Sequence, residues 1–202
     1  MNSRLVLLHG WGATSDDLEP LGRSLAAAIN LPLEVVALAA PYLHPQPPGR
    51  QWYGLFPADW DAVPAAVEAL QERLKAITRH GPSMELTVLL GFSQGGAMAL
   101  SSGCSLPLAG VISCSGYPHP NWQPADEHPP VLVMHGRQDT IVPATAMDGI
   151  TERLRSDRCE TISFDNGHTI PEEMVQPMLA FLKRVLEGCL LYTSDAADDR
   201  SC

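Results

Sequence analysis

The chain has 202 residues, of which 45% are hydrophobic and 18% are charged, and its formal net charge is −10 at pH 7. A chain of this length forms one domain with a hydrophobic core of its own. Its 13 Lys and Arg residues form no cluster and are outnumbered by 23 acidic residues, which argues against nucleic acid and anionic membrane surfaces as partners. No run of 18 apolar residues predicts a membrane span.

Short apolar runs typical of β-strands alternate along the chain with stretches of helical pattern. The runs cover residues 5–8, 33–38, 86–90, 110–114, 131–135 and 160–164. This alternation predicts an α/β fold, with a mainly parallel sheet of about six strands and helices on both faces. The clearest helical face is formed by Val63, Val67, Leu70, Leu74 and Ile77. Since there are no repeats and no second domain, residues 1–188 are expected to form one domain.

The segment from Pro41 to Trp60 interrupts this alternation and is too irregular to predict a strand. It concentrates aromatic residues among prolines, and loops of this kind often form pocket walls. We expect the substrate pocket to involve Trp52, Tyr53 and Phe56, together with Trp11. The alternative is a surface loop whose aromatic residues attach it to the core.

Ser93 is the candidate nucleophile. It lies in Gly91-Phe92-Ser93-Gln94-Gly95, directly after an apolar run and before a stretch of small residues. This order of strand, tight turn and helix is typical of a nucleophile elbow, in which glycines flank a serine that projects from the top of the sheet. A serine hydroxyl is a weak nucleophile at neutral pH, so it needs a base, a carboxylate that orients the base, and an oxyanion hole.

The acid and the base are expected on loops that follow later strands, in the order serine, acid, histidine. Asp139 follows the run at 131–135, and His168 follows the run at 160–164. We therefore predict a Ser93-His168-Asp139 triad. Asp165 lies on the same loop as His168 and is the main alternative for the acid.

The remaining histidines are weaker candidates for the base. His9 and His135 end apolar runs before a glycine, so we expect them to hold turn geometry by hydrogen bonding. His44, His80, His119 and His128 are expected at the surface.

Two backbone N–H groups are candidates for the oxyanion hole. One belongs to Gln94, the residue after the nucleophile, and the other to Trp11 in the loop after the first strand. The glycines in His9-Gly10-Trp11-Gly12 allow the amides to turn inward. The alternative is a tight connecting loop with a packing tryptophan.

The tail from residue 189 to residue 202 resembles the translation of a sequencing-library adapter, which indicates a draft or environmental genome as the source. We therefore expect it to be non-native or disordered. Over the whole chain, the five cysteines form no Cys-x-x-Cys pair and no metal-ligand spacing, which fits a reducing compartment. The first residues lack the apolar stretch of a signal peptide, so we expect a cytoplasmic protein.

Taken together, the motifs resemble the phospholipase/carboxylesterase family of single-domain α/β-hydrolases, which includes small carboxylesterases and acyl-protein thioesterases. The matching segments lie at residues 8–13, 91–97, 115–117, 135–139, 167–168 and 171–173, and Gly49-Arg50-Gln51-Trp52-Tyr53 is similar to an aromatic loop motif of the family. The resemblance implies that Ser93, Asp139 and His168 form the triad and that Trp11 and Gln94 supply the oxyanion amides. One departure is the short N-terminus, which leaves no room for an additional leading strand.

The expected function is hydrolysis of short- to medium-chain esters or thioesters through an acyl-enzyme, without a cofactor or metal. The partner would then be a small-molecule substrate. An amidase, peptidase or lysophospholipase could use the same triad, and a non-catalytic ligand-binding protein could keep the same fold. The sequence leaves open the oligomeric state, including a homodimer.

Overall fold

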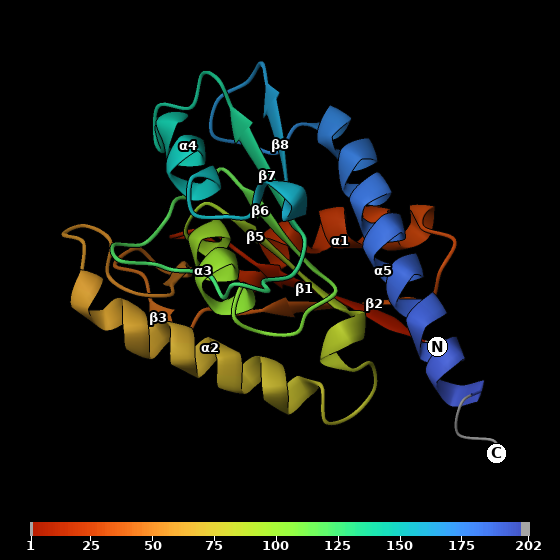
Figure 1. Cartoon of the computed structure of the whole chain (residues 1–202). Helices are drawn as coiled ribbons and strands as arrows, with labels where there is room; N and C mark the ends of the chain where they lie inside the picture. The colour runs from red at the N-terminus through yellow and green to blue at the C-terminus, as the bar shows by residue number, and fades with distance from the viewer. Residues whose placement is uncertain (1, 199–202) are drawn as a thin grey trace.

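The computed structural model of this chain describes residues 2–198 and places its six longer strands in one parallel sheet (Figure 1). The strands are β1 (Ser3–Leu8), β2 (Leu33–Leu38), β5 (Thr87–Phe92), β6 (Gly110–Cys114), β7 (Val131–Gly136) and β8 (Cys159–Phe164). Their order across the sheet is β2-β1-β5-β6-β7-β8, and every neighbouring pair is parallel. The expected α/β fold is confirmed, and each strand overlaps one of the predicted runs.

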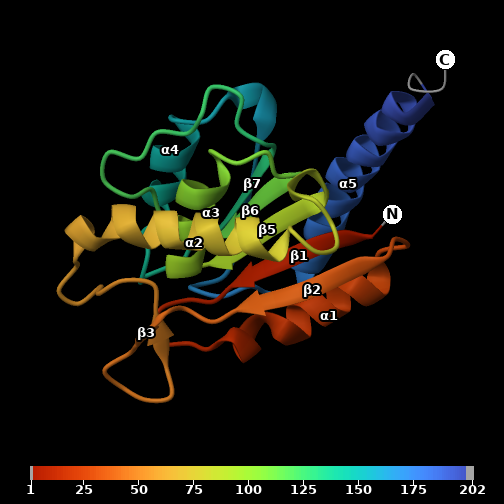
Figure 2. The ribbon, with the colours of Figure 1, turned by 90° about the horizontal axis from the view of Figure 1, so that it is seen from below.

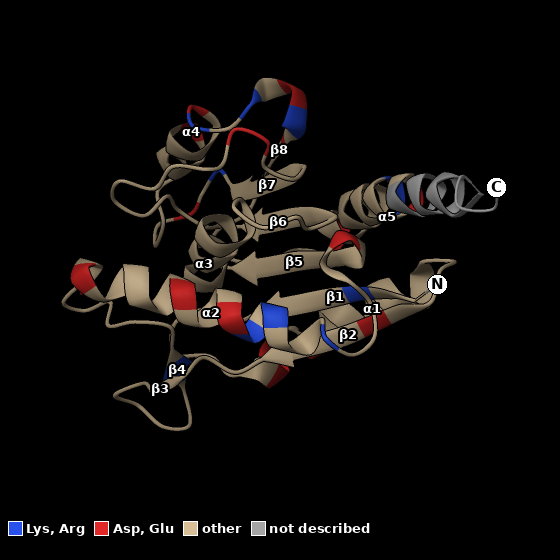
Figure 3. Cartoon of the chain, turned by 60° about the horizontal axis from the view of Figure 1, so that its bottom comes forward, with Lys and Arg blue, Asp and Glu red and all other residues tan. Residues whose placement is uncertain are grey.

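The strands are apolar because helices cover both faces of the sheet. In β1, Leu5 and Leu7 pack into one core, whereas Val6 and Leu8 pack into the other. This alternation follows from the two-residue period of a strand, and burial on both faces explains the nearly continuous hydrophobic runs. The three central strands β5, β6 and β7 contain no charged residue (Figure 3).

The helices form a layer on each side of the sheet. They are α1 (Glu19–Ala28), α2 (Val63–Ile77), α3 (Gln94–Gly103), α4 (Thr145–Thr151) and α5 (Val175–Asp198). Helices α1 and α5 share one core, and α2, α3 and α4 share the other. Figure 2 shows α1 and α2 on opposite sides of the sheet. The result is a three-layer sandwich in which loops at the carboxyl ends of the strands are free to form a site.

Helix α2 bears out the predicted helical face. Pro64 lies in its first turn, where a missing N–H costs little. Val63, Leu70 and Leu74 are buried in the core, and Val67 and Ile77 pack against it from a partly buried position.

The segment from Pro41 to Trp60 contains a short hairpin that the sequence analysis did not predict. Strands β3 (Tyr42–Leu43) and β4 (Arg50–Gln51) pair antiparallel. The Arg50 side chain also donates hydrogen bonds to the carbonyl groups of Ala40 and Pro41. With two residues each, these strands are too short to produce an alternating pattern in the sequence.

Helix α5 continues further than expected. It extends from Val175 to Asp198, although we expected no ordered structure beyond residue 188. Residues 189–198 contain several leucines and alanines and no proline, and helix propagation adds one hydrogen bond for each residue fixed. The expectation for residues 199–202 lies outside the described residues.

The chain reverses its direction across the sheet between β1 and β5. From β1 the chain passes through α1 to the edge strand β2, and it then returns through α2 to β5 on the other side of β1. The carboxyl ends of β1 and β5 are neighbours, with Leu8 paired to Gly91. In open α/β sheets, ligands bind outside the carboxyl ends of the strands at such a switch point.

Candidate active site

Ser93 lies in the sharp turn between β5 and α3. Its φ of 55° and ψ of −118° are unusual for a non-glycine residue, and its N–H donates to the Cys114 carbonyl at 2.9 Å. The turn brings Gly91 against the backbone of Gly95, and a side chain at Gly91 would collide with the Gly95 carbonyl. The backbone of this segment therefore has the geometry of a nucleophile elbow.

The side chains of Ser93, His168 and Asp139 form a continuous hydrogen-bonded chain. The Nε2 atom of His168 lies 2.9 Å from Oγ of Ser93, and its Nδ1 atom lies 2.7 Å from Oδ2 of Asp139. The Asp139 side chain is completely buried, whereas the His168 side chain is 17% exposed. These three residues come from loops after β5, β7 and β8, and the structure brings them together at one edge of the sheet.

Asp139 is held as a carboxylate by its surroundings. Burial alone would raise the pKa of its carboxyl group. Hydrogen bonds from His168 and from the backbone N–H groups of Val142 and Ile141 lower this pKa by a larger amount, so the net shift is downward. Both backbone groups donate to Oδ1 at 2.9 Å, which leaves Oδ2 for His168. This arrangement fixes the orientation of the carboxylate toward the imidazole.

Asp165, the alternative acid, points elsewhere. Its side chain is 79% exposed and forms an ion pair with Arg137 at 2.7 Å. The structure therefore offers Asp139, and not Asp165, as the partner of His168.

The other histidines divide into three groups. His9 and His135 hydrogen-bond to backbone groups of nearby turns and loops, in line with the expected structural role: His9 to the Gly10 carbonyl and to the Ala40 N–H after β2, and His135 to the Val142 carbonyl. His80 is exposed, also as expected. The remaining three are buried, so the expectation of a surface position was wrong. They are His44, His119 and His128.

The loop that carries one candidate oxyanion amide lies against Ser93, because a side chain at Gly10 would contact Cβ of Ser93 at 3.4 Å. Gln94 is the first residue of α3, where the backbone N–H has no partner within the helix. The neighbouring amides of Gly12 and Ala13 donate to Arg50 and Gly10, but within residues 2–198 no backbone acceptor is found for the N–H of Trp11. Neither amide is therefore paired with a backbone acceptor among the described residues.

The aromatic residues expected to line the substrate pocket occupy different environments. Trp52 and Tyr53 are each 1% exposed, which corrects the expectation that they contact substrate. They were misassigned because aromatic residues in a loop look the same in sequence whether they face a pocket or the core. Phe56 is exposed, and its ring lies 5.0 Å from that of the partly buried Trp11 in an edge-to-face contact.

Trp52 and Tyr53 hydrogen-bond to the two segments that carry the candidate oxyanion amides. The Gln94 side chain accepts a hydrogen bond from the Trp52 N–H at 3.0 Å and donates to the Tyr53 carbonyl at 2.9 Å. The Trp52 indole donates to the His9 carbonyl at 2.9 Å. One short segment therefore connects the loops that carry both candidate amides.

A buried polar cluster continues from this segment. The Tyr53 hydroxyl lies 2.6 Å from the Tyr117 hydroxyl and 2.7 Å from Nε2 of His119, and Nδ1 of His119 lies 2.7 Å from Oγ of Ser101. Burial lowers the pKa of His119 to about 4, and burial also raises the pKa of Tyr117 to about 12. The cluster is therefore neutral at pH 7.

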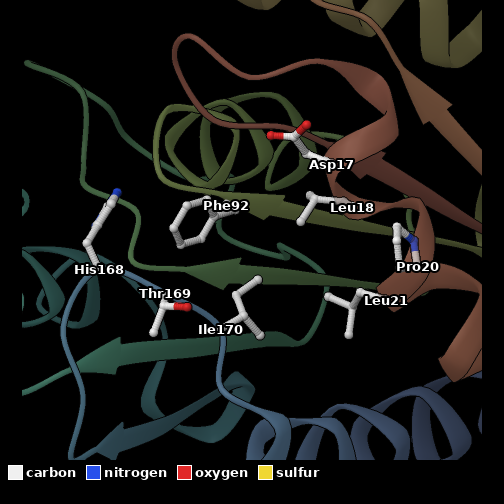
Figure 4. Close-up of a pocket in the computed structure, with 8 residues that line it drawn as sticks. All are labelled: Asp17, Leu18, Pro20, Leu21, Phe92, His168, Thr169 and Ile170. Atoms are coloured by element: carbon white, nitrogen blue, oxygen red, sulfur yellow. The ribbon is translucent and has the colours of Figure 1, made fainter.

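A cavity of about 390 Å³ opens beside His168 (Figure 4). Its walls come from the start of α1 and the turn before it, from the end of β5, and from the loop after β8. The lining residues are Asp17, Leu18, Pro20, Leu21, Phe92, His168, Thr169 and Ile170.

The model of a phospholipase/carboxylesterase family matches residues 2–186. The chain belongs to this family. It is a hydrolase of the carboxylesterase and thioesterase type.

Proteins similar to this phospholipase/carboxylesterase family member include an esterase and an acyl-protein thioesterase. It is 27% identical over 189 residues to the esterase YpfH of Escherichia coli, covering 89% of this chain and 81% of that protein. It is 25% identical over 155 residues to acyl-protein thioesterase 1 of Eremothecium gossypii, covering 69% of this chain but only 64% of the length of that protein. The crystal structure of esterase PE8 superposes with a TM-score of 0.80 at 30% identity, covering 92% of this chain and 93% of that one.

Two features of this family member were missed by sequence reasoning. The first is the cavity beside His168, whose apolar residues Leu18 and Leu21 follow Trp11 within ten residues. That closeness is a signal the sequence does contain. The second is the polar cluster around Tyr53 and His119, and no pattern in the sequence connects these distant residues.

Among residues 2–198, we find no group of three metal-binding side chains, and no helix is both long and apolar enough to span a membrane.

Proposed function

We propose that this protein is a serine hydrolase that cleaves short- to medium-chain carboxylic esters or thioesters through an acyl-enzyme. The observation that carries the proposal is the hydrogen-bonded chain from Oγ of Ser93 through His168 to Asp139, with distances of 2.9 and 2.7 Å. These distances are within the reach that a general base requires.

In the first half of the reaction, Oγ of Ser93 attacks the acyl carbon and its proton passes to Nε2 of His168. Asp139 keeps the imidazole oriented and stabilises its protonated form. The N–H groups of Trp11 and Gln94 donate to the oxyanion, and such a donor is typically worth about 10² to 10³ in rate. His168 then gives its proton to the departing alcohol or thiol.

In the second half, water replaces the alcohol. His168 takes a proton from the water as it attacks the acyl-enzyme, and collapse of the second tetrahedral intermediate returns the proton to Ser93 and releases the acid. No step of this mechanism requires a cofactor or a metal. Thioesters are included because acyl-protein thioesterases are among the relatives.

For the acyl chain, we propose the surface formed by Trp11 and Phe56. Their rings are in contact, and Phe56 is 73% exposed, so it offers apolar surface to a substrate. Trp11 also supplies a proposed oxyanion amide, which places this surface next to the acyl carbon. An open surface of this kind favours short and medium chains, because it encloses little of a long one.

The test is hydrolysis of 4-nitrophenyl esters from acetate to laurate, and of the matching acyl thioesters, by the wild-type protein and by Ser93→Ala. We expect turnover by the wild-type protein, a preference for the shorter chains, and loss of turnover in the variant by about 10³-fold or more. Full activity of Ser93→Ala would contradict the mechanism. Failure of the wild-type protein on every ester and thioester would contradict the function.

A further inference from the structure

The cavity beside His168 has no role in the proposed function so far. The transfer of a proton from His168 to the leaving group indicates a role for this cavity. His168 must deliver its proton to the leaving oxygen or sulfur, so that atom lies within hydrogen-bond distance of Nε2. The proposed oxyanion donors, the N–H groups of Trp11 and Gln94, face the carbonyl oxygen in this mechanism, which is a different substituent of the acyl carbon from the leaving atom. The alcohol or thiol portion of the substrate therefore extends past the imidazole of His168.

The walls of this cavity suit an apolar group. Phe92 lies between His168 and Leu18 in Figure 4, and its ring centroid is 4.8 Å from that of His168. Leu21 and Ile170 complete the apolar lining. The volume of about 390 Å³ is at the small end of the range for ligand pockets. It fits an aromatic ring or a short branched alkyl group.

The charge of the lining is one-sided. Asp17 contributes a carboxylate, and no Lys or Arg lines the cavity. Its neighbour Asp16 is also exposed but does not line the cavity. An anionic leaving group would be repelled by Asp17, whereas a cationic one would be attracted.

We propose that this cavity is the subsite for the leaving alcohol or thiol, that it takes apolar groups, and that Asp17 makes it select neutral and cationic groups over anionic ones. The proposal rests on the proposed hydrolase function and adds the substrate class on the leaving-group side.

The charge is tested with butyrate esters of choline and of 3,3-dimethylbutanol, which have the same shape and differ by one positive charge. We expect Asp17→Asn to lower the ratio of kcat/KM for the choline ester to that for the neutral ester by about fivefold, mainly through KM. Asp16→Asn is the matched control, and its ratio should equal that of the wild-type protein. An unchanged ratio in Asp17→Asn, or an equal change in both variants, would overturn the charge selection.

The location is tested by filling the cavity with Leu21→Trp. We expect kcat/KM for phenyl butyrate to fall about tenfold or more, while kcat/KM for ethyl butyrate stays within about twofold of the wild-type value. If the variant instead loses activity only as the acyl chain lengthens, the cavity holds the acyl group and the proposal is wrong. An equal loss on phenyl and ethyl esters would also overturn it. In each of these cases the wild-type protein still cleaves esters, so the proposed function survives. A wild-type protein that cleaves no ester removes both proposals.

Discussion

The side-chain carbonyl of Gln94 accepts a hydrogen bond from the backbone N–H of Trp52 at 3.0 Å. Gln94 is completely buried, and its amide group also donates to the Tyr53 carbonyl. The residue whose backbone N–H is a proposed oxyanion donor therefore uses its side chain to hold the loop behind that site. Support of this kind matters because transition-state donors act only when they are already in position.

Replacing Gln94 with leucine should reduce both stability and activity. Gln94→Leu leaves a buried donor on Trp52 and a buried acceptor on Tyr53 without partners, at about 1–3 kcal/mol each. We also expect kcat to fall at least about tenfold, since the loop is no longer fixed. Urea denaturation and steady-state kinetics measure the two effects.

Gln71→Leu is the matched control for this substitution. The Gln71 side chain donates to the Ser102 carbonyl and to Ser105 from a partly exposed position on α2. It should lose about 1 kcal/mol of stability and keep the wild-type kcat. If both glutamine variants lose activity equally, the effect comes from general destabilisation and not from the loss of the Gln94 hydrogen bonds.

Substituting the two candidate acids, Asp139 and Asp165, should affect activity very differently. Asp139→Asn keeps an acceptor for the N–H groups of Ile141 and Val142 but no longer holds His168 in the required tautomer, so kcat should fall by roughly 10⁴-fold. Asp165→Asn removes only an exposed ion pair with Arg137 and should keep full activity. Steady-state kinetics on one ester compares them, and a large loss in Asp165→Asn would reassign the acid.

The positions of the six longer strands along the chain, and the positions of Ser93, Asp139 and His168 after three of them, could be predicted from sequence because both rest on local signals. A strand buried on both faces reads as an apolar run, and an elbow requires small residues around its serine. The acid and the base then follow from their positions just after later strands.

The environment of Trp52, Tyr53 and His119 could not be predicted in the same way. Their burial depends on contacts between the loop at 41–60, the loop after β6 and α3, which lie far apart in the chain. A histidine in a proline-rich loop is exposed unless such partners surround it, and no local pattern indicates the partners. The two-residue strands β3 and β4 were missed for a related reason, because their pairing depends on the register between them.

The buried His119 should make stability depend on pH. Burial lowers its pKa to about 4 in the folded protein, whereas an unfolded chain has a histidine pKa near 6.5. Between these values the unfolded chain binds more protons, so the free energy of unfolding decreases as the pH falls. From pH 6.5 to pH 5 the loss from His119 amounts to about 2 kcal/mol. Burial also lowers the pKa of His9, which acts in the same direction.

Urea denaturation between pH 5 and pH 7.5 measures this dependence. His119→Asn should show a clearly smaller loss of stability on acidification than the wild-type protein. His80→Asn, at an exposed position, should keep the wild-type dependence. An identical pH dependence in His119→Asn and wild type would mean that His119 is not held neutral in the folded state.

The same substitution should have opposite effects at two glycines. At Gly95, a side chain would collide with the backbone carbonyl groups of Leu8 and His9, where β1 passes the start of α3. Backbone cannot yield as a flexible side chain does, so Gly95→Ala should cost about 3 kcal/mol or more. At Gly188, within α5, the added carbon would meet no atom within 4 Å apart from its chain neighbours and the nearby backbone of the helix itself, and alanine should stabilise the helix by about 0.5–1 kcal/mol. Thermal unfolding of the two variants compares them directly. If Gly95→Ala proved as stable as wild type, the close approach of α3 to β1 that positions Ser93 beside the Trp11 loop would be wrong.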